Sequence, residues 1–287
     1  MRQRFPLLCL LAATGLVAGC ENTGDEEARR TLEAVNVIDE SNLNDIMLTV
    51  ADPEEAVNYF RKATAQQPDR IDLKRGLAKS LVRAQRPAEA APVWAQVVAS
   101  PGVTNADRVE YADALIRTND WKGAEAALAA TPPTYETYQR YRLEAMVADS
   151  KKEWSKADSY YETAAGLTTR PSGVLNNWGF SKLSRGDAAG AERLFTESLR
   201  FDPASFTTKN NLVLARSAQR KYDLPVVSMT QTERAMLYYT AGLAAVKQGD
   251  LTIGRGLLQE ALDTHPQYFE EAARAIAALD SAPSTGG

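Results

Sequence analysis

Small and bulky apolar residues recur along residues 56–198 with a period of about 34 positions. Each period contains an alanine, a mostly bulky apolar residue four positions later, and a third residue seven positions after the alanine. The alanines are Ala56, Ala90, Ala124, Ala157 and Ala191; the second set is Phe60, Trp94, Leu128, Tyr161 and Phe195; the third set is Ala63, Val97, Thr131, Ala164 and Ser198. Offsets of four and seven place all three residues on one face of a helix. The pattern therefore predicts a repeated, buried helix.

A second helix is expected in each period, upstream of the first. Pro68 and Pro203 stop the alanine-bearing helices, Gly186 marks a turn before one of them, and the small Gly179 lies twelve positions before Ala191. A helix–turn–helix of this length resembles the tetratricopeptide repeat. The resemblance implies an all-α fold, a right-handed superhelical solenoid of stacked units. A chain of 287 residues would otherwise suggest two ordinary domains.

The repeat divides the chain as follows. We assign units at about 37–70, 71–104, 105–137, 138–171, 172–205 and 235–268, with a degenerate unit at 206–234, so the array covers 37–268. In the degenerate unit Pro225 occupies the alanine position, which predicts a first helix at 206–221 followed by an extended connector. An apolar stripe over 269–280 predicts a C-terminal capping helix, and residues 281–287 are expected to be a disordered tail.

The N-terminus has the features of an export signal. Arg2 and Arg4 precede an apolar stretch that is too short to span a bilayer and has the length of a signal-peptide core. It ends in Leu16-Val-Ala-Gly-Cys20, which resembles the lipobox of bacterial lipoproteins. That resemblance implies cleavage of residues 1–19 and a covalent diacylglycerol and acyl lipid, such as palmitate, on Cys20. An ordinary signal peptide or a short buried helix is the alternative interpretation.

Composition and charge fit an envelope protein that binds other proteins. The net charge of −4 gives no basis for nucleic-acid binding. Residues 20–36 form an acidic, flexible tether. After cleavage Cys20 would be the only cysteine, which leaves no disulfide framework, and His265 is the only histidine. We found no phosphate-binding loop, dinucleotide fingerprint or metal-binding histidine pair. We therefore expect no enzymatic activity, no cofactor other than the lipid, no metal and no small-molecule substrate.

The candidate partner-binding residues are those that the repeat family places on its concave face. Arg75, Lys79 and Arg83 are spaced by four in one first helix and would form a basic ridge for an acidic or C-terminal peptide. Asn177 and Asn211 occupy the same position in two successive first helices, where an amide can hold a peptide backbone. The alternatives are a solvated face for the cations and a consensus residue for the asparagines. Four tryptophans, Trp94, Trp121, Trp154 and Trp178, are expected to pack in the core.

Three segments give a more specific resemblance. They are 44–53 (NDIMLTVADP), 68–84 (PDRIDLKRGLAKSLVRA) and 227–235 (VSMTQTERA), the last continuing to 265–272 (HPQYFEEA). With the lipobox and the proline-broken unit, they make the chain resemble the TadD family of tetratricopeptide lipoproteins, which serve Flp (tight adherence) pilus assembly. The resemblance implies a lipid-anchored adaptor with secretin or pilus-assembly proteins as partners.

The residue that follows Cys20 bears on the location of the protein. Glu21, which follows Cys20, favours the outer membrane over the inner one, so we expect a periplasm-facing, outer-membrane protein. An outer-membrane adaptor for protein insertion or polysaccharide export is the alternative function, and an enzyme is the least favoured one.

Overall fold

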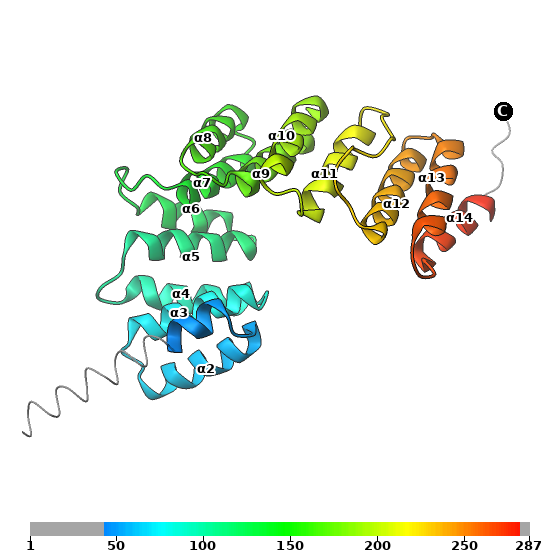
Figure 1. The fold of residues 1–287 in the computed structure, drawn as a ribbon. Helices are drawn as coiled ribbons and strands as arrows, with labels where there is room; N and C mark the ends of the chain where they lie inside the picture. Colours follow the sequence, from blue (N-terminus) through cyan, green and yellow to red (C-terminus); the bar gives the residue numbers. More distant parts are fainter. Residues whose placement is uncertain (1–42, 282–287) are drawn as a thin grey trace, which may run out of the picture. The chain divides into compact units, whose positions relative to one another are not determined.

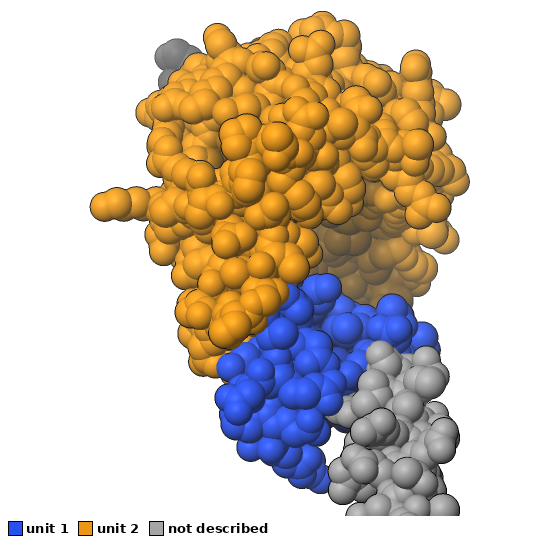
Figure 2. Space-filling model, turned by 90° about the vertical axis from the view of Figure 1, so that its left-hand side faces the viewer, with its two compact units in different colours: residues 1–85 blue, residues 86–287 orange. Residues whose placement is uncertain are grey.

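The computed structural model describes residues 43–281, and within this range it is helical with no strand. Cys20 and the predicted tether lie outside the described residues. The chain divides into two compact units, residues 1–85 and residues 86–287, coloured separately in Figure 2. The division falls between two helices of the predicted unit 71–104. Each unit is described by itself.

Unit 1 contains a helical segment at 43–49, α2 (Pro53–Gln66) and α3 (Ile71–Arg83). Asp52 caps α2, because its carboxylate accepts hydrogen bonds from the amides of Glu54 and Glu55. The ring of Phe60 lies so close to Gly76 that a Cβ at Gly76 would be 2.3 Å from ring carbon Cε1. A small residue in α3 is therefore what allows α2 and α3 to pack together.

Unit 2 is a helical solenoid in which consecutive helices pack on one another (Figure 1). Its helices are α4 (Pro87–Ala99), α5 (Asn105–Arg117), α6 (Trp121–Ala129), α7 (Tyr138–Ser150), α8 (Trp154–Gly166), α9 (Ser172–Ser184), α10 (Ala188–Phe201), α11 (Phe206–Ser217), α12 (Gln231–Lys247), α13 (Leu251–Thr264) and α14 (Glu270–Ser281). The first helices also contact one another directly, α5 with α7, α7 with α9 and α9 with α11. They therefore form one continuous layer, which is the layer that carries the site described below.

The predicted apolar stripe is the core of the structure. All of its members are buried except Ala63, which is half-buried; Trp94, Ala124, Phe195 and Ser198 have no exposed surface. The alanines and the bulky residues have different packing roles. Small residues lie where two helix backbones meet, and large rings fill the space between helices.

From α3 onwards, the turn that follows each first helix has the same conformation. A residue with positive φ follows the first helix at Gln85, Asn119, Lys152, Gly186, Arg220 and Gly249. A left-handed residue ends a helix by letting its amide bond back to the last turn. The same conformation occurs at Arg220, after α11, although no second helix follows α11. The turn therefore forms at the end of a first helix whether or not a second helix comes after it.

The connector 221–230 is free of helix, as Pro225 predicts, while α11 ends at Ser217 rather than at 221. Leu224 and Met229 pack on a buried cluster of Val213, Leu237 and Ala241, and Val227 packs beside Phe195 and Leu212. Lys209 of α11 is buried and donates to both carboxylate oxygens of Glu233 in α12, at 3.1 Å each. The connector thus replaces the missing helix with a few apolar contacts, while the Lys209–Glu233 ion pair joins the helices on either side of it.

In the last pair two helix backbones approach closely. A Cβ at Gly254 in α13 would lie 3.0 Å from the carbonyl oxygen of Gly242 in α12, and a Cβ at Gly242 would lie 3.1 Å from the carbonyl oxygen of Gly254. Glycine at both positions therefore allows two helix backbones to touch. The predicted capping helix is α14, which buries Ala272 and Ile276.

Candidate functional site

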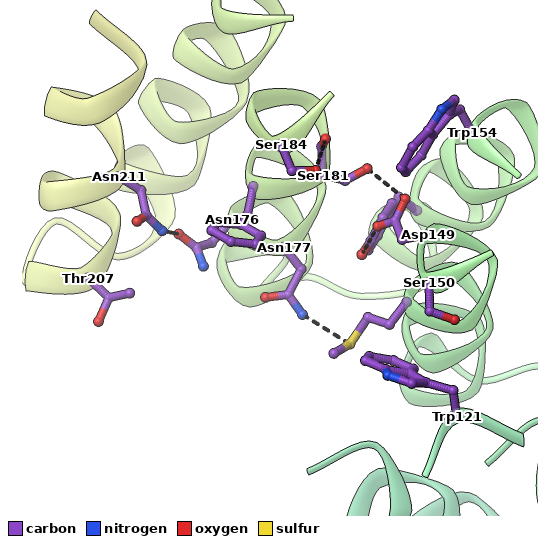
Figure 3. Close-up of a pocket in the computed structure, with 13 residues that line it drawn as sticks. Trp121, Asp149, Ser150, Trp154, Asn176, Asn177, Ser181, Ser184, Thr207 and Asn211 are labelled. Atoms are coloured by element: carbon purple, nitrogen blue, oxygen red, sulfur yellow. Dashed lines mark hydrogen bonds between the residues drawn. The ribbon is translucent and has the colours of Figure 1, made fainter. Parts of the chain in front are cut away.

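A cavity of about 530 Å³ opens on the layer of first helices in unit 2 (Figure 3). Helices α7, α9 and α11 form most of its wall, and the start of α6 together with Trp154 and Tyr161 of α8 completes it. The lining residues are Trp121, Met146, Asp149, Ser150, Trp154, Tyr161, Asn176, Asn177, Phe180, Ser181, Ser184, Thr207 and Asn211. Its size is that of a typical ligand site, and its wall combines apolar surface with a few polar groups.

Two tryptophans stand at equivalent positions in the cavity wall. Trp121 is the first residue of α6 and Trp154 the first residue of α8, and both are half-buried. The indole of Trp121 donates to the side chain of Asn119 at 2.7 Å. The guanidinium of Arg185 lies 5.6 Å from the centre of the Trp154 ring. Trp121 packs against the buried cluster that includes Leu128 and Leu143, as expected of a core residue, but both Trp121 and Trp154 also line the cavity.

The other two tryptophans do not line the cavity. Trp94 is fully buried, and Trp178 is half-buried, stacks on Tyr161 with the ring centres 6.2 Å apart, and donates to Asp158 at 2.6 Å. Phe180 is more than half exposed and lines the cavity. The exposed apolar surface of the cavity therefore comes from Phe180, Trp121, Trp154 and Met146.

Asp149 is the charged residue of the cavity wall. Its carboxylate accepts a hydrogen bond from the Tyr161 hydroxyl at 2.9 Å and one from Ser181 Oγ at 2.7 Å. Burial raises the pKa of the Asp149 carboxyl, and the two hydrogen bonds oppose that shift without cancelling it. Burial and the nearby Asp149 also raise the pKa of Tyr161. A partly desolvated carboxylate is thus held in place by two neutral donors.

The two predicted asparagines are brought together in this cavity. Asn177 Nδ2 lies 3.5 Å from the Met146 sulfur, a weak contact, and Asn211 Nδ2 donates to Asn176 Oδ1 at 3.1 Å. Three amides on α9 and α11 therefore form a row along the cavity, as Figure 3 shows. Because an amide has two donors and an acceptor with two lone pairs, each retains capacity for a ligand.

The basic ridge lies in unit 1, and the structure gives its three members different environments. Lys79 is exposed and Arg75 is half-buried. The guanidinium of Arg83 donates to the carbonyl oxygens of Met47, Leu48 and Ala51 at 2.8–3.0 Å. Arg83 therefore binds the last carbonyls of the helical segment 43–49, a structural role, and the ridge that a ligand could contact is reduced to Arg75 and Lys79.

Sequence reasoning missed Asp149, Phe180 and Met146 as cavity residues. One signal was present, namely that Trp121 and Trp154 recur 33 positions apart at the start of a second helix. Within residues 43–281 no group of three metal-binding side chains comes together. Over the same residues, no helix has the length and apolarity needed to cross a bilayer.

Solved structures with the same arrangement are tetratricopeptide repeat and related proteins. A tetratricopeptide repeat protein from Parabacteroides merdae matches with a TM-score of 0.54 at 11% identity, over 86% of this chain and 96% of that one. The chain has the tetratricopeptide repeat fold. The Cut9–Hcn1 hetero-tetramer of APC/C matches with a TM-score of 0.59 at 13% identity, over 79% of this chain and 46% of that one.

The human IFIT1 dimer with PPP-AAAA matches with a TM-score of 0.56 at 14% identity, over 79% of this chain and 59% of that one. The chain thus spans about half the length of the Cut9–Hcn1 and IFIT1 chains that it matches. At these identities the likeness concerns the fold alone. No protein-family model and no curated protein sequence matches the chain.

Proposed function

We propose that this protein is an adaptor that binds an extended segment of a partner protein along the layer formed by α7, α9 and α11. The observation that carries the proposal is the cavity itself, in which the first helices α9 and α11 supply asparagine amides and α6, α8 and α9 supply aromatic rings. Amides bind a peptide backbone whatever its sequence, while the apolar wall selects side chains.

The adaptor works as a lipid-anchored component of the cell envelope. The sequence Leu16-Val-Ala-Gly-Cys20 supports lipidation at Cys20, and the acidic tether would hold the repeats away from anionic lipid. The resemblance to the TadD family supports a role in assembly of a Flp-type pilus, with the secretin or another pilus-assembly protein as partner, on the periplasmic side of the outer membrane. Binding requires no cofactor, metal or turnover.

Site-specific photo-crosslinking tests the binding site. A photoreactive amino acid placed at Thr207, which is exposed in the cavity wall, should form covalent adducts with the partner in intact cells. The matched control is Glu260, which is exposed on α13 and does not line the cavity. Asn177→Ala combined with Asn211→Ala should lower the yield at Thr207. Identical adducts at Thr207 and Glu260 would contradict binding at the cavity.

A second experiment tests the anchor and the pathway separately. Cys20→Ser should move the protein from the membrane fraction to the soluble periplasmic fraction, and a variant that stays with the membrane would contradict lipidation at Cys20. Mass spectrometry of the Thr207 adducts should identify a secretin or another pilus component. Adducts with proteins of outer-membrane insertion or polysaccharide export would place the adaptor in one of those systems instead.

A further inference from the structure

Asp149 differs from the other carboxylates nearby because its partners carry no charge. Its two hydrogen bonds come from the hydroxyls of Tyr161 and Ser181. Asp158, by contrast, is paired with Arg185 and, at 3.0 Å, with Lys182. Although burial acts to raise the pKa of Asp158, the hydrogen bonds from Arg185, Trp178 and Lys182 lower it overall. Within residues 43–281, then, Asp158 forms ion pairs and Asp149 forms none, although the charge of Arg185 also acts to lower the pKa of Asp149.

The neighbouring cations are already neutralised. Lys182 lies 3.7 Å from Asp187 as well as 3.0 Å from Asp158, and Arg185 is bonded to Asp158. Lys182 and Arg185 are therefore two cations for the three carboxylates Asp149, Asp158 and Asp187. Arg142, whose charge also acts on Tyr161, is paired with Asp113. The carboxylate left without an ion pair is at the cavity, since Asp149 lines it and Asp158 and Asp187 do not. A partly buried charge without a counter-ion is costly, and the cost falls when a cation arrives.

Each oxygen of the Asp149 carboxylate can accept more than it does. A carboxylate oxygen offers two lone pairs, and each oxygen of Asp149 accepts one hydrogen bond from the protein. An ammonium or guanidinium group could therefore bond to Asp149 without displacing Tyr161 or Ser181. Charge-assisted hydrogen bonds of this kind are shorter and stronger than neutral ones.

The aromatic wall is suited to the same chemistry. Trp121, Trp154 and Phe180 line the cavity together with Asp149, and ring faces attract cations, tryptophan most strongly. The Trp154 ring already has the guanidinium of Arg185 at 5.6 Å from its centre. An apolar side chain would fit the rings but would bury Asp149 further, while an acidic side chain would be repelled by it.

We infer that the cavity receives a lysine or arginine side chain of the partner's extended segment, with Asp149 as its counter-ion and Trp121, Trp154 and Phe180 around its aliphatic stem and charged head. This inference rests on the proposed function and deepens it, because it names the residue type that the groove selects. The row of asparagines then holds the backbone on either side of that residue.

The test uses a charged probe and its neutral isostere on the full chain. N-acetyl-arginine methylamide and N-acetyl-citrulline methylamide have nearly the same shape, and only the first carries a charge. The indole N–H signals of the four tryptophans are followed by NMR during each titration. We expect the arginine probe to shift the signals of Trp121 and Trp154, with the buried Trp94 unchanged, and the citrulline probe to bind at least about tenfold more weakly.

Variants complete the test. Asp149→Asn should reduce arginine binding to the level of citrulline, whereas Asp263→Asn, which removes an exposed carboxylate on α13, should leave it unchanged. The comparison of the two probes on the unmodified protein stands even if Asp149→Asn disturbs the fold. Equal binding of the two probes, preferential binding of N-acetyl-phenylalanine methylamide, or no shift at Trp121 and Trp154 would overturn the inference. Adducts at Thr207 with a partner whose crosslinked segment contains no lysine or arginine would overturn it while leaving the adaptor function intact.

Discussion

Gly179 in α9 lies directly against the ring of Phe195 in α10, and a Cβ at this glycine would be 2.7 Å from ring carbon Cε1. Phe195 has no exposed surface, so its ring cannot move outward to make room. Gly76 of α3 likewise lies directly against the ring of Phe60, which belongs to the preceding helix α2. A glycine against an aromatic ring thus packs helices both within a repeat, α9 on α10, and between successive repeats, α2 on α3.

Gly179→Ala should therefore destabilise the protein. We expect a loss of about 1–3 kcal/mol in the free energy of unfolding from overpacking, reduced by the better helix propensity of alanine. Gly173→Ala is the matched control, because Gly173 is in the same helix and has no atom within 4 Å of its Cβ position. It should be neutral or slightly stabilising. Urea unfolding followed by circular dichroism measures both, and equal effects would contradict the packing argument.

The connector offers a second matched pair in two adjacent valines. Val226 is fully exposed, whereas Val227 is half-buried and packs beside Phe195 and Leu212. Val227→Ala should cost about 1 kcal/mol of unfolding free energy, because it removes partly buried methyl groups, and Val226→Ala should cost almost nothing. If thermal unfolding showed the same midpoint for both variants, the connector would not be packed as described.

Arg83 provides a prediction about local stability in unit 1. Arg83→Met removes the donors to Met47, Leu48 and Ala51, so amide hydrogen exchange across residues 43–51 should become faster. Lys79→Met, an exposed change on the same helix, should leave that exchange as it is. If hydrogen exchange were unchanged in both variants, Arg83 would have no structural role at residues 43–51.

The Lys209–Glu233 ion pair makes stability depend on pH. The backbone hydrogen bond at Thr230 and the charge of Lys209 lower the pKa of Glu233, against the opposing effect of burial. A carboxyl with a lowered pKa in the folded state contributes stability above its ordinary pKa, and that contribution is lost as pH falls through the lowered value. Glu233→Gln should accordingly lower stability at neutral pH and change little in acid.

The measurement is the unfolding free energy of both proteins from about pH 7 to about pH 3. The two curves should converge at the acid end of the series. Parallel curves would show that Glu233 does not titrate differently in the folded and unfolded states. Glu260→Gln, which removes an exposed carboxylate on α13, is the control variant measured in the same series.

Much of the fold could be predicted because the repeat makes the same physical demand in each unit. Helix packing requires an alanine at each helix contact and a bulky residue four positions later, so both recur with the repeat and can be read from the sequence. Pro225 likewise marks the place where the second helix is missing. The end of α11 was placed four residues late, because the left-handed turn at Arg220 lies in a stretch with no glycine to mark it.

The site was only partly predictable, for a different reason. A spacing of four places Arg75, Lys79 and Arg83 on one helix face but does not tell which of them finds backbone carbonyls nearby; Arg83 does. Asn177 and Asn211 were found because the family marks that position. Asp149 could not be found in the same way. Its role depends on having hydroxyl partners and no ion pair, and these partners come from helices α8 and α9.

The close approach of Gly242 and Gly254 has a consequence for recognising relatives of this chain. No side chain larger than hydrogen fits at either position without moving a helix, so a genome search can use two glycines twelve positions apart as a marker of this last helix pair. Combined with a proline at the position of Pro225, the marker would identify chains that lack the second helix of the preceding unit. It would separate them from repeat proteins that retain that helix.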